Sequence, residues 1–316
     1  MRLLLIGTGP FALPTFLALY STDHRIVALV TSPLRLQRGS EPLPPSPLRD
    51  LAQKHHTPIF DPEDINTRES QSRLSQFNAD LLVVCDYGQI LKAATLAAAR
   101  LGGINLHASL LPKYRGAAPI NWVIYHGESK TGVTAIHMTP EVDAGPCIAQ
   151  AELAIDPDET AVELEKRLAE LGAELVCRTI TSLESGNLQT LPQDPALVSK
   201  APRLKKTDGL IDWSRSAQAI KNQIRAMEPW PKTYSFWHRQ KGPPMRLIFG
   251  PVTVEDHAKS VPPGTVLEVG ADRLLIAAGS GAVAPTSLQP VGKRLMEIEE
   301  FLHGYRVQPG DCFGGE

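Results

Sequence analysis

Short apolar runs alternate with segments of helical spacing along the amino-terminal part of the chain, and this alternation constrains the fold more than any other feature. The runs are apolar almost throughout, as in parallel strands covered on both faces. Strands that alternate with helices form right-handed crossovers and build a sheet with helices on both sides. The pattern therefore predicts an α/β domain with a Rossmann-like, doubly wound and mostly parallel sheet. The expected strands are residues 2–7, 25–32, 58–60, 80–87 and 102–109, followed by one at 131–140.

The segments between these runs place apolar residues at helical spacing. Residues 158–186 form the longest such pattern, in which Gly172 marks an expected interruption. Residues 33–47 are rich in proline and are expected to be irregular. The other expected helices of this part are 10–22, 48–57, 68–79, 90–101 and 118–127.

The composition changes after about Gly186. Residues 187–209 are polar, basic and proline-containing, as in a linker between domains. A helix is expected at 216–227, and short strands split by Gly/Pro turns follow it, a pattern typical of a small β-barrel. These strands are expected at 245–250, 264–270 and 273–279. We therefore predict a Rossmann-like domain over 1–188, a basic linker over 189–206 and an OB-like β-barrel domain over 207–316.

Composition excludes several classes of protein. The four cysteines contain no Cys-x-x-Cys pair, which argues against a zinc site or a disulfide framework and favours a reducing cytoplasm. No run of eighteen apolar residues occurs, so no membrane span is expected. The formal net charge of −2 provides no overall positive field, so any nucleic acid must be bound by locally grouped basic residues.

The glycine-rich segment 7–12, GTGPFA, matches a dinucleotide-binding pattern, which is a weak signal alone. A site for NAD would also need an acidic residue near the end of the second strand, which instead ends Val30-Thr31-Ser32. Arg35 leaves a 2′-phosphate, and hence NADP, open. A tight strand-to-helix turn is the favoured interpretation of these glycines.

The block NLHASLLPKYRGAAP (105–119) carries the strongest chemical signal. Asn105 and His107 are two residues apart on an expected strand, so their side chains share a face. An amide and an imidazole can polarise a carbonyl and handle a proton, but neither is a strong nucleophile. Ser109 lacks the glycine-flanked elbow of hydrolases. The pattern indicates acyl transfer directly to a nucleophile of the substrate, although an Asn-x-His pair can also be a simple strand-end cap.

A third polar group would orient or charge the imidazole. Asp143 is the best candidate, because it lies in the turn EVDAGP (141–146) after an expected strand. It is distant from His107 in sequence, so only the fold can bring the two together.

This block resembles the Asn-x-His-x-Ser-Leu-Leu-Pro-x-x-Arg-Gly-x-x-Pro motif of the folate-dependent formyltransferases. The resemblance implies that the catalytic Asn, His and Asp of the family correspond to Asn105, His107 and Asp143. It also implies 10-formyltetrahydrofolate as co-substrate, no metal, and transfer of its formyl group to the amino group of methionine on initiator tRNA. Similar segments follow in the same order at 7–14, 44–52, 87–91, 208–220, 228–231 and 287–296.

The resemblance also implies binding residues. Folate contacts are expected from a turn, Ser109, Leu110, Leu111 and Pro112, and from a loop, Tyr87, Gly88, Gln89, Ile90 and Leu91. Contacts with tRNA are expected from Arg35 and Arg38 in the segment 33–47. The basic residues Lys200, Arg203, Lys205 and Lys206 of the linker are expected to contact phosphates as well, although such a charge run can also be a solvated face. The segment 33–47 carries fewer basic residues than is usual in the family, and "VDAGP" departs from the common Leu-Asp-Thr-Gly.

Two alternatives stay open. Formyltransferases that act on sugar nucleotides share the Asn-His-Asp chemistry, but a small substrate would not need the basic linker and second domain. A protein of another class, an RNA-binding protein without catalysis, would not need all three polar residues. We therefore expect a cytoplasmic, monomeric enzyme that acts on initiator Met-tRNA and does not bind membranes.

Overall fold

The structure is a computed structural model, and it divides into two compact units that we describe separately. It describes residues 1–34, 46–186, 188–239, 242–257 and 261–315. The first unit comprises residues 1–119, 130–154 and 165–202. The second comprises residues 120–129, 155–164 and 203–316.

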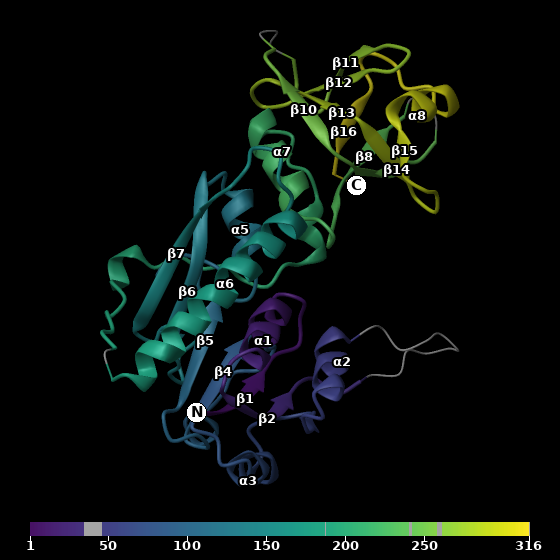
Figure 1. The fold of residues 1–316 in the computed structure, drawn as a ribbon. Coiled ribbons are helices and arrows are strands. Elements are labelled where there is room, and N and C mark those ends of the chain that lie inside the picture. Colours follow the sequence, from purple (N-terminus) through teal and green to yellow (C-terminus); the bar gives the residue numbers. More distant parts are fainter. Residues whose placement is uncertain (35–45, 187, 240–241, 258–260, 316) are drawn as a thin grey trace. The chain divides into compact units, whose positions relative to one another are not determined.

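A seven-stranded sheet with the order β3-β2-β1-β4-β5-β6-β7 forms the centre of the first unit (Figure 1). The five strands from β3 to β5 pair in parallel, and β6 and β7 extend the sheet in antiparallel pairing. This arrangement confirms the expected α/β fold with a mostly parallel sheet. The strands are β1 (Arg2–Ile6), β2 (Arg25–Val30), β3 (Ile59–Phe60), β4 (Leu81–Cys85), β5 (Gly103–His107), β6 (Lys130–His137) and β7 (Cys147–Ala154).

The central strands β1 and β4 are buried on both faces, which explains why their sequences are apolar almost throughout. Leu4 and Leu82 point to the face where Leu74 of α3 and Leu96 of α4 complete one apolar core. Phe16 of α1 packs beside Gly7, at the end of β1. The helices of this unit are α1 (Ala12–Tyr20), α2 (Pro47–Lys54), α3 (Arg68–Gln76), α4 (Ala93–Leu96) and, from residue 165 onward, α6 (Ala161–Glu184). The helix α5 (Pro119–Tyr125) belongs to the second unit apart from its first residue.

In this part of the chain, three elements differ from the expectations. The strand β7 was not predicted, because its residues are only partly buried and its apolar pattern is weak. The helix expected at 90–101 is reduced to α4, since the backbone N–H of Leu101 bonds to Asp80 and draws the chain back to the sheet. The helix α6 continues through Gly172, where a Cβ would meet Leu106 of β5 at 2.5 Å. A small residue there permits close packing of helix and strand instead of a break.

The second unit contains two antiparallel sheets with the orders β10-β13-β12-β11 and β15-β14-β9-β8-β16. They enclose a core in which Trp213, Phe249 and Phe313 contact one another with ring centroids 5.7–5.9 Å apart. The expectation of a small OB-like β-barrel domain is confirmed to the extent that this unit is built from antiparallel sheets. Its strands are β8 (Thr233–His238), β9 (Met245–Phe249), β10 (Val252–Glu255), β11 (Val266–Val269), β12 (Leu274–Ala277), β13 (Ala282–Pro285), β14 (Ser287–Pro290), β15 (Met296–Glu297) and β16 (Cys312–Gly314), and its helices α7 (Ala217–Ala226) and α8 (Ile298–Gly304).

The segment expected to be a linker does not run free of the first unit. Leu191 pairs with Cys147, and Lys200 pairs with Arg115, through backbone hydrogen bonds. The domain boundaries at residues 188 and 206 stay a prediction. No helix in the described part of the chain combines the length and apolar character that a bilayer crossing requires.

Candidate active site

Strand β5 places Asn105 and His107 at the edge of the sheet where its parallel neighbour β4 also ends. The two side chains share one face of the strand, because side chains alternate along an extended backbone. Ile104 and Leu106 fill the other face and are almost completely buried. Ligands of open α/β sheets bind at this carboxyl edge, so both polar side chains lie where a substrate is expected.

The turn between β6 and β7 brings Asp143 to both of these residues. Its Oδ1 accepts a hydrogen bond from Asn105 Nδ2 at 3.4 Å, and its Oδ2 lies 3.5 Å from His107 Nδ1. The backbone N–H of Gly116 donates to the same Oδ2 at 2.9 Å. The side chains of His107 and Asp143 are only 6% and 13% exposed. The structure therefore gathers an amide, an imidazole and a carboxylate from two separate segments of the chain.

Backbone conformation helps to aim the carboxylate. Asp143 has a φ of 51°, a left-handed conformation that residues other than glycine adopt rarely and that tends to cluster at functional sites. Tyr114 has a φ of 60°, and its carbonyl oxygen faces the imidazole. Strained residues therefore lie on both sides of His107.

The protonation of each ring nitrogen of His107 is linked to the oxygen atom that it faces. Nε2 lies 2.9 Å from the carbonyl oxygen of Tyr114, which can only accept, so Nε2 carries a proton in this orientation. Nδ1 faces the Asp143 carboxylate. A ring that also donated a proton from Nδ1 to this carboxylate would be the imidazolium, with its positive charge beside the Asn105 amide.

Among the residues that the structure describes, no side chain beside this cluster is set up as a nucleophile. Ser109 is completely buried, and its hydroxyl donates to the carbonyl oxygen of Lys113 at 2.7 Å. Cys147 begins β7, where burial raises the pKa of its thiol, and the nearby Arg115 opposes this only in part. A neutral thiol is a poor nucleophile. The arrangement can stabilise a developing oxyanion and accept a proton, but it offers no group to carry an acyl intermediate.

The turn 109–112 is held by residues of β6 and β7 that the sequence did not single out. Thr134 Oγ1 donates to the carbonyl oxygen of Ser109 at 2.6 Å and accepts from the Leu111 N–H at 3.1 Å. Gln150 Nε2 donates to the carbonyl oxygen of Leu111 at 2.7 Å. Leu111 is buried, while Leu110 is partly open to solvent. The polar alternation of these two strands was the only sequence signal for Thr134 and Gln150.

The loop 87–91 leaves the end of β4, next to the strand that carries Asn105 and His107. The amide of Gln89 is bound to the preceding segment, where its Oε1 accepts from the Ile65 N–H at 3.0 Å. Leu91 is buried, whereas Ile90 is 59% exposed and a Cβ at Gly88 would meet no atom within 4 Å. The open side of this loop is therefore at Gly88 and Ile90.

The hydroxyl of Tyr87, in the same loop, is buried and has no hydrogen-bond partner among the described residues. Burial, and next the charge of Asp64, raise the pKa of Tyr87 to about 12. A buried hydroxyl without a partner is costly, so this atom is a candidate contact for a ligand.

The glycine-rich turn at 7–12 is filled by the neighbouring strand end. A Cβ at Gly9 would collide with the carboxylate of Asp86, and the Thr8 N–H bonds to the Asp86 carbonyl oxygen at 2.9 Å. Asp86 is open to solvent on one side, but protein atoms crowd its others, and this desolvation raises the pKa of its carboxyl. A carboxylate at this position would repel a pyrophosphate. The geometry favours a tight turn over a dinucleotide site.

The residues expected to contact tRNA are described only in part. Arg35 and Arg38 lie outside the described residues. Lys200, Arg203, Lys205 and Lys206 are all exposed, and their charged ends make no hydrogen bond or ion pair within the described part of the chain. Their charges are available to a polyanion.

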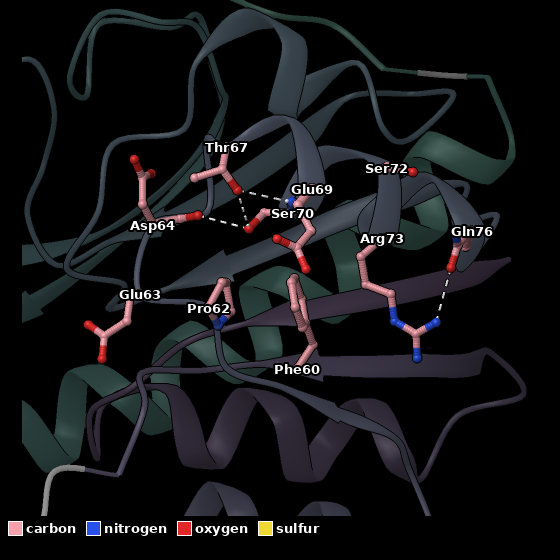
Figure 2. A pocket seen from close by; sticks show the side chains of 10 residues that line it. All are labelled: Phe60, Pro62, Glu63, Asp64, Thr67, Glu69, Ser70, Ser72, Arg73 and Gln76. Carbon is pink, nitrogen blue, oxygen red and sulfur yellow. Dashed lines mark hydrogen bonds between the residues drawn. The ribbon is translucent and has the colours of Figure 1, made fainter.

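A hollow of about 660 Å³ lies beside α3, and none of its lining residues belongs to the cluster of Asn105, His107 and Asp143 (Figure 2). Four of its polar side chains bind one another: the Thr67 hydroxyl donates to Ser70, and Arg73 bonds to Gln76. Thr67 also caps α3 by accepting from the Ser70 N–H. These contacts serve the helix, and we assign no part of the reaction to this hollow. Within the described residues, no group of His, Cys, Asp or Glu is arranged to hold a metal ion.

Comparison with known proteins identifies the family of the chain. The model of the formyl transferase family matches residues 1–180, and that of the formyl transferase C-terminal domain matches residues 203–306. The chain is similar to a methionyl-tRNA formyltransferase from Citrifermentans bemidjiense, with 42% identity over 99% of this chain and 96% of the relative. It is 44% identical to one from Rhodopirellula baltica, over 98% of this chain and 96% of that relative.

Among solved structures, the chain is similar to an N-formyltransferase from Helicobacter canadensis in complex with folinic acid and dTDP-3-aminofucose. The TM-score is 0.67 at 18% identity, covering 90% of this chain and 98% of the other. At this identity the likeness concerns the fold alone.

Proposed function

The chain belongs to the formyl transferase family through both of its domains, and from this premise we propose that it formylates the methionine of initiator tRNA. The formyl group of 10-formyltetrahydrofolate is transferred to the free amino group of Met-tRNA, giving N-formylmethionyl-tRNA for translation initiation. The observation that carries the proposal is the convergence of Asn105, His107 and Asp143 at the end of β5. It occurs in a chain that resembles methionyl-tRNA formyltransferases over nearly its whole length.

Asn105 stabilises the oxygen of the formyl group as the amine attacks. One N–H of its amide faces Asp143, which fixes the orientation of the group and leaves the other N–H for the developing oxyanion. Loss of one such donor typically costs about 10²–10³ in rate.

His107 supplies positive charge beside the same oxygen. The Tyr114 carbonyl oxygen lies 2.9 Å from Nε2 and the Asp143 carboxylate lies 3.5 Å from Nδ1, so each ring nitrogen faces an oxygen atom. Because the ring is almost completely buried, its field is weakly screened by water and acts strongly on the reacting carbonyl.

Asp143 balances that charge and receives the proton that the attacking amine loses, directly or through water. A new C–N bond forms to the methionyl nitrogen, the bond between the formyl carbon and the folate nitrogen breaks, and that folate nitrogen takes up a proton. A general base of this kind is typically worth about 10²–10⁴ in rate.

The folate co-substrate is placed between the loop Tyr87–Leu91 and the turn Ser109–Pro112. Both segments follow neighbouring strands, and the space over Gly88 is open. Exposed Ile90 and the partly open Leu110 offer apolar surface to a flat heterocycle, while backbone groups supply its hydrogen bonds. The hydroxyl of Ser109 is already used inside the turn, so its part is to shape that turn.

The tRNA is bound by Arg35, Arg38, Lys200, Arg203, Lys205 and Lys206. In support, the last four carry charges without partners in the described part of the chain. When the logarithm of the binding constant for tRNA is plotted against the logarithm of the salt concentration, removing one side chain that binds a phosphate should reduce the slope by about 1. Neutralising Lys205 and Lys206 together should therefore flatten this slope, and an unchanged slope would exclude them from the interface.

The enzyme works as a monomer in the cytoplasm. In support, all three catalytic side chains come from one chain, and aminoacylated tRNA is a cytoplasmic substrate.

The experiment that tests the function compares two acceptors with 10-formyltetrahydrofolate: aminoacylated initiator tRNA and an amino-sugar nucleotide. We expect formylation of Met-tRNA only. Formylation of the sugar alone would replace the proposal by the sugar-nucleotide alternative. His107→Ala should abolish turnover and leave tRNA binding nearly intact, and tRNA binding without turnover by the unaltered chain would indicate a non-catalytic RNA-binding protein.

A further inference from the structure

The segment that follows α6 returns to the active site, and we call residues 191–201 the return segment. Leu191 exchanges two backbone hydrogen bonds with Cys147, at 2.8 and 2.9 Å. Further along, the carbonyl oxygen of Ser199 accepts from the Arg115 N–H at 2.9 Å, and the Ala201 N–H donates to the Arg115 carbonyl oxygen at 2.7 Å. The return segment is thus attached to both chain segments that surround the Asp143 carboxylate.

Gln193 lies between these attachments, and its amide group is fully used. Its Nε2 donates to the carbonyl oxygens of Asp143 and Gly145, both at 2.7 Å. Its Oε1 accepts from Arg115 Nε at 3.0 Å and from Arg115 Nη2 at 2.8 Å. One side chain therefore joins the backbone of the Asp143 turn to the residue preceding Gly116.

These bonds bear on catalysis because the Asp143 turn is strained. A left-handed conformation at a residue other than glycine persists only where the surrounding structure holds it. Gln193 holds the two carbonyl oxygens of this turn. Through Arg115 it also holds the segment that supplies the Gly116 N–H to the Asp143 carboxylate and the Tyr114 carbonyl oxygen to His107.

We propose that Gln193 is a positioning residue for the formyl transfer. It fixes the Asp143 turn and the 114–116 segment relative to each other, so that the carboxylate stays in reach of both Asn105 and His107. The inference rests on the proposed function and adds to it a residue outside the block 105–119. A lone glutamine in a polar segment gave no sequence signal for this position.

Gln193→Glu is the sharpest perturbation, because it is isosteric and retains an acceptor for Arg115 while removing both donors. The new carboxylate would face two carbonyl oxygens, and the turn would move away from it. A displacement of about 1 Å in a catalytic group can cost roughly 100-fold in rate. We expect kcat to fall by about 10- to 100-fold, with the KM values for both substrates within about twofold of the original.

Gln189→Glu is the matched control. It makes the same change of charge four positions earlier, at an exposed residue outside the return segment, and should leave kcat unchanged. A double-mutant cycle with Asp143→Asn then separates positioning from general stability. If Gln193 acts through Asp143, Gln193→Glu should lower kcat little further in the Asp143→Asn background.

Two results would overturn the proposal. One is an unchanged kcat in Gln193→Glu, and the other is a double mutant in which the reductions of kcat by Gln193→Glu and Asp143→Asn multiply as independent effects. If thermal unfolding shows that Gln193→Glu is not folded, the same criteria apply to Gln193→Asn. This variant keeps the amide donors and the carbonyl acceptor, but its side chain is too short to span the contacts. Formylation of Met-tRNA by the unaltered chain is measured first. Its absence would refute the proposed function, whereas the other results concern Gln193 alone.

Discussion

Replacing Gly116 by alanine should damage catalysis more than its effect on stability explains. Gly116 has a φ of 128°, in a region that is essentially restricted to glycine, and its N–H donates to Asp143 Oδ2 at 2.9 Å. A Cβ there would lie 2.5 Å from the carbonyl oxygen of Ala201. Gly116→Ala therefore strains the backbone and forces apart two segments at the catalytic carboxylate.

The size of the effect follows from these distances. Carbon and oxygen approach to roughly 3.3 Å even in close backbone contacts, so the two segments must separate by about 0.8 Å. Backbone strain costs about 1–3 kcal/mol, and relief of the overlap adds a further ~1–3 kcal/mol. Displacing the N–H donor by nearly 1 Å should lower kcat by up to about 100-fold.

The assay combines thermal unfolding with initial rates of Met-tRNA formylation, in matched variants. Gly292 also has a positive φ, of 71°, so an alanine there strains the backbone, but no atom lies within 4 Å of the added Cβ. Gly292→Ala should lose stability through strain alone and keep its kcat. Gly304→Ala, also in open space, lies in the last turn of α8 without a left-handed backbone, so it should keep its kcat and its stability should be unchanged or raised.

The two measurements separate catalytic displacement from instability. If Gly116→Ala kept its kcat within about threefold while unfolding at a lower temperature, the Gly116 N–H would have no part in placing the Asp143 carboxylate. That result would refute the geometry on which the proposed mechanism depends.

Three further predictions concern other parts of the chain. Tyr87→Phe should leave the free energy of unfolding unchanged or raise it, because the hydroxyl that it removes is buried without a partner among the described residues; urea unfolding that showed a decrease above about 1 kcal/mol would reveal a partner for this hydroxyl. The Arg2 backbone N–H, which donates to Asp80 at 2.8 Å, lowers the pKa of that carboxyl. A carboxyl whose pKa is lowered by folding stabilises the protein at pH values above its unfolded pKa of about 3.9, and this stability is lost as the pH falls through the folded pKa. Asp80→Asn should therefore lower the free energy of unfolding at pH 7 but not in stronger acid. Equal destabilisation at both pH values would contradict this reasoning. Ser235→Ala should cost about 1–3 kcal/mol in thermal unfolding, since it strands the buried Trp213 indole N–H that donates to Ser235 at 2.9 Å; an unchanged unfolding temperature would show that the indole finds another acceptor.

Much of the first domain could be predicted from local pattern. The runs at 2–7 and 80–87 became β1 and β4 because both of their faces are buried, and continuous apolar sequence is the direct consequence of that burial. The strand β7 was missed for the opposite reason, since it is only partly buried and lacks that pattern. The short helix α4 was overestimated because a contact with Asp80, distant in sequence, ends it.

By itself, the sequence determined the α/β architecture and the shared face of Asn105 and His107, because both depend on periodicity over a few residues. The tertiary structure alone decided how Asp143 reaches them, through a left-handed backbone and the N–H of Gly116. It also decided that Gln193 ties that turn to Arg115. Such contacts join segments tens of residues apart, and no local spacing encodes a hydrogen bond that exists only once the sheet has assembled.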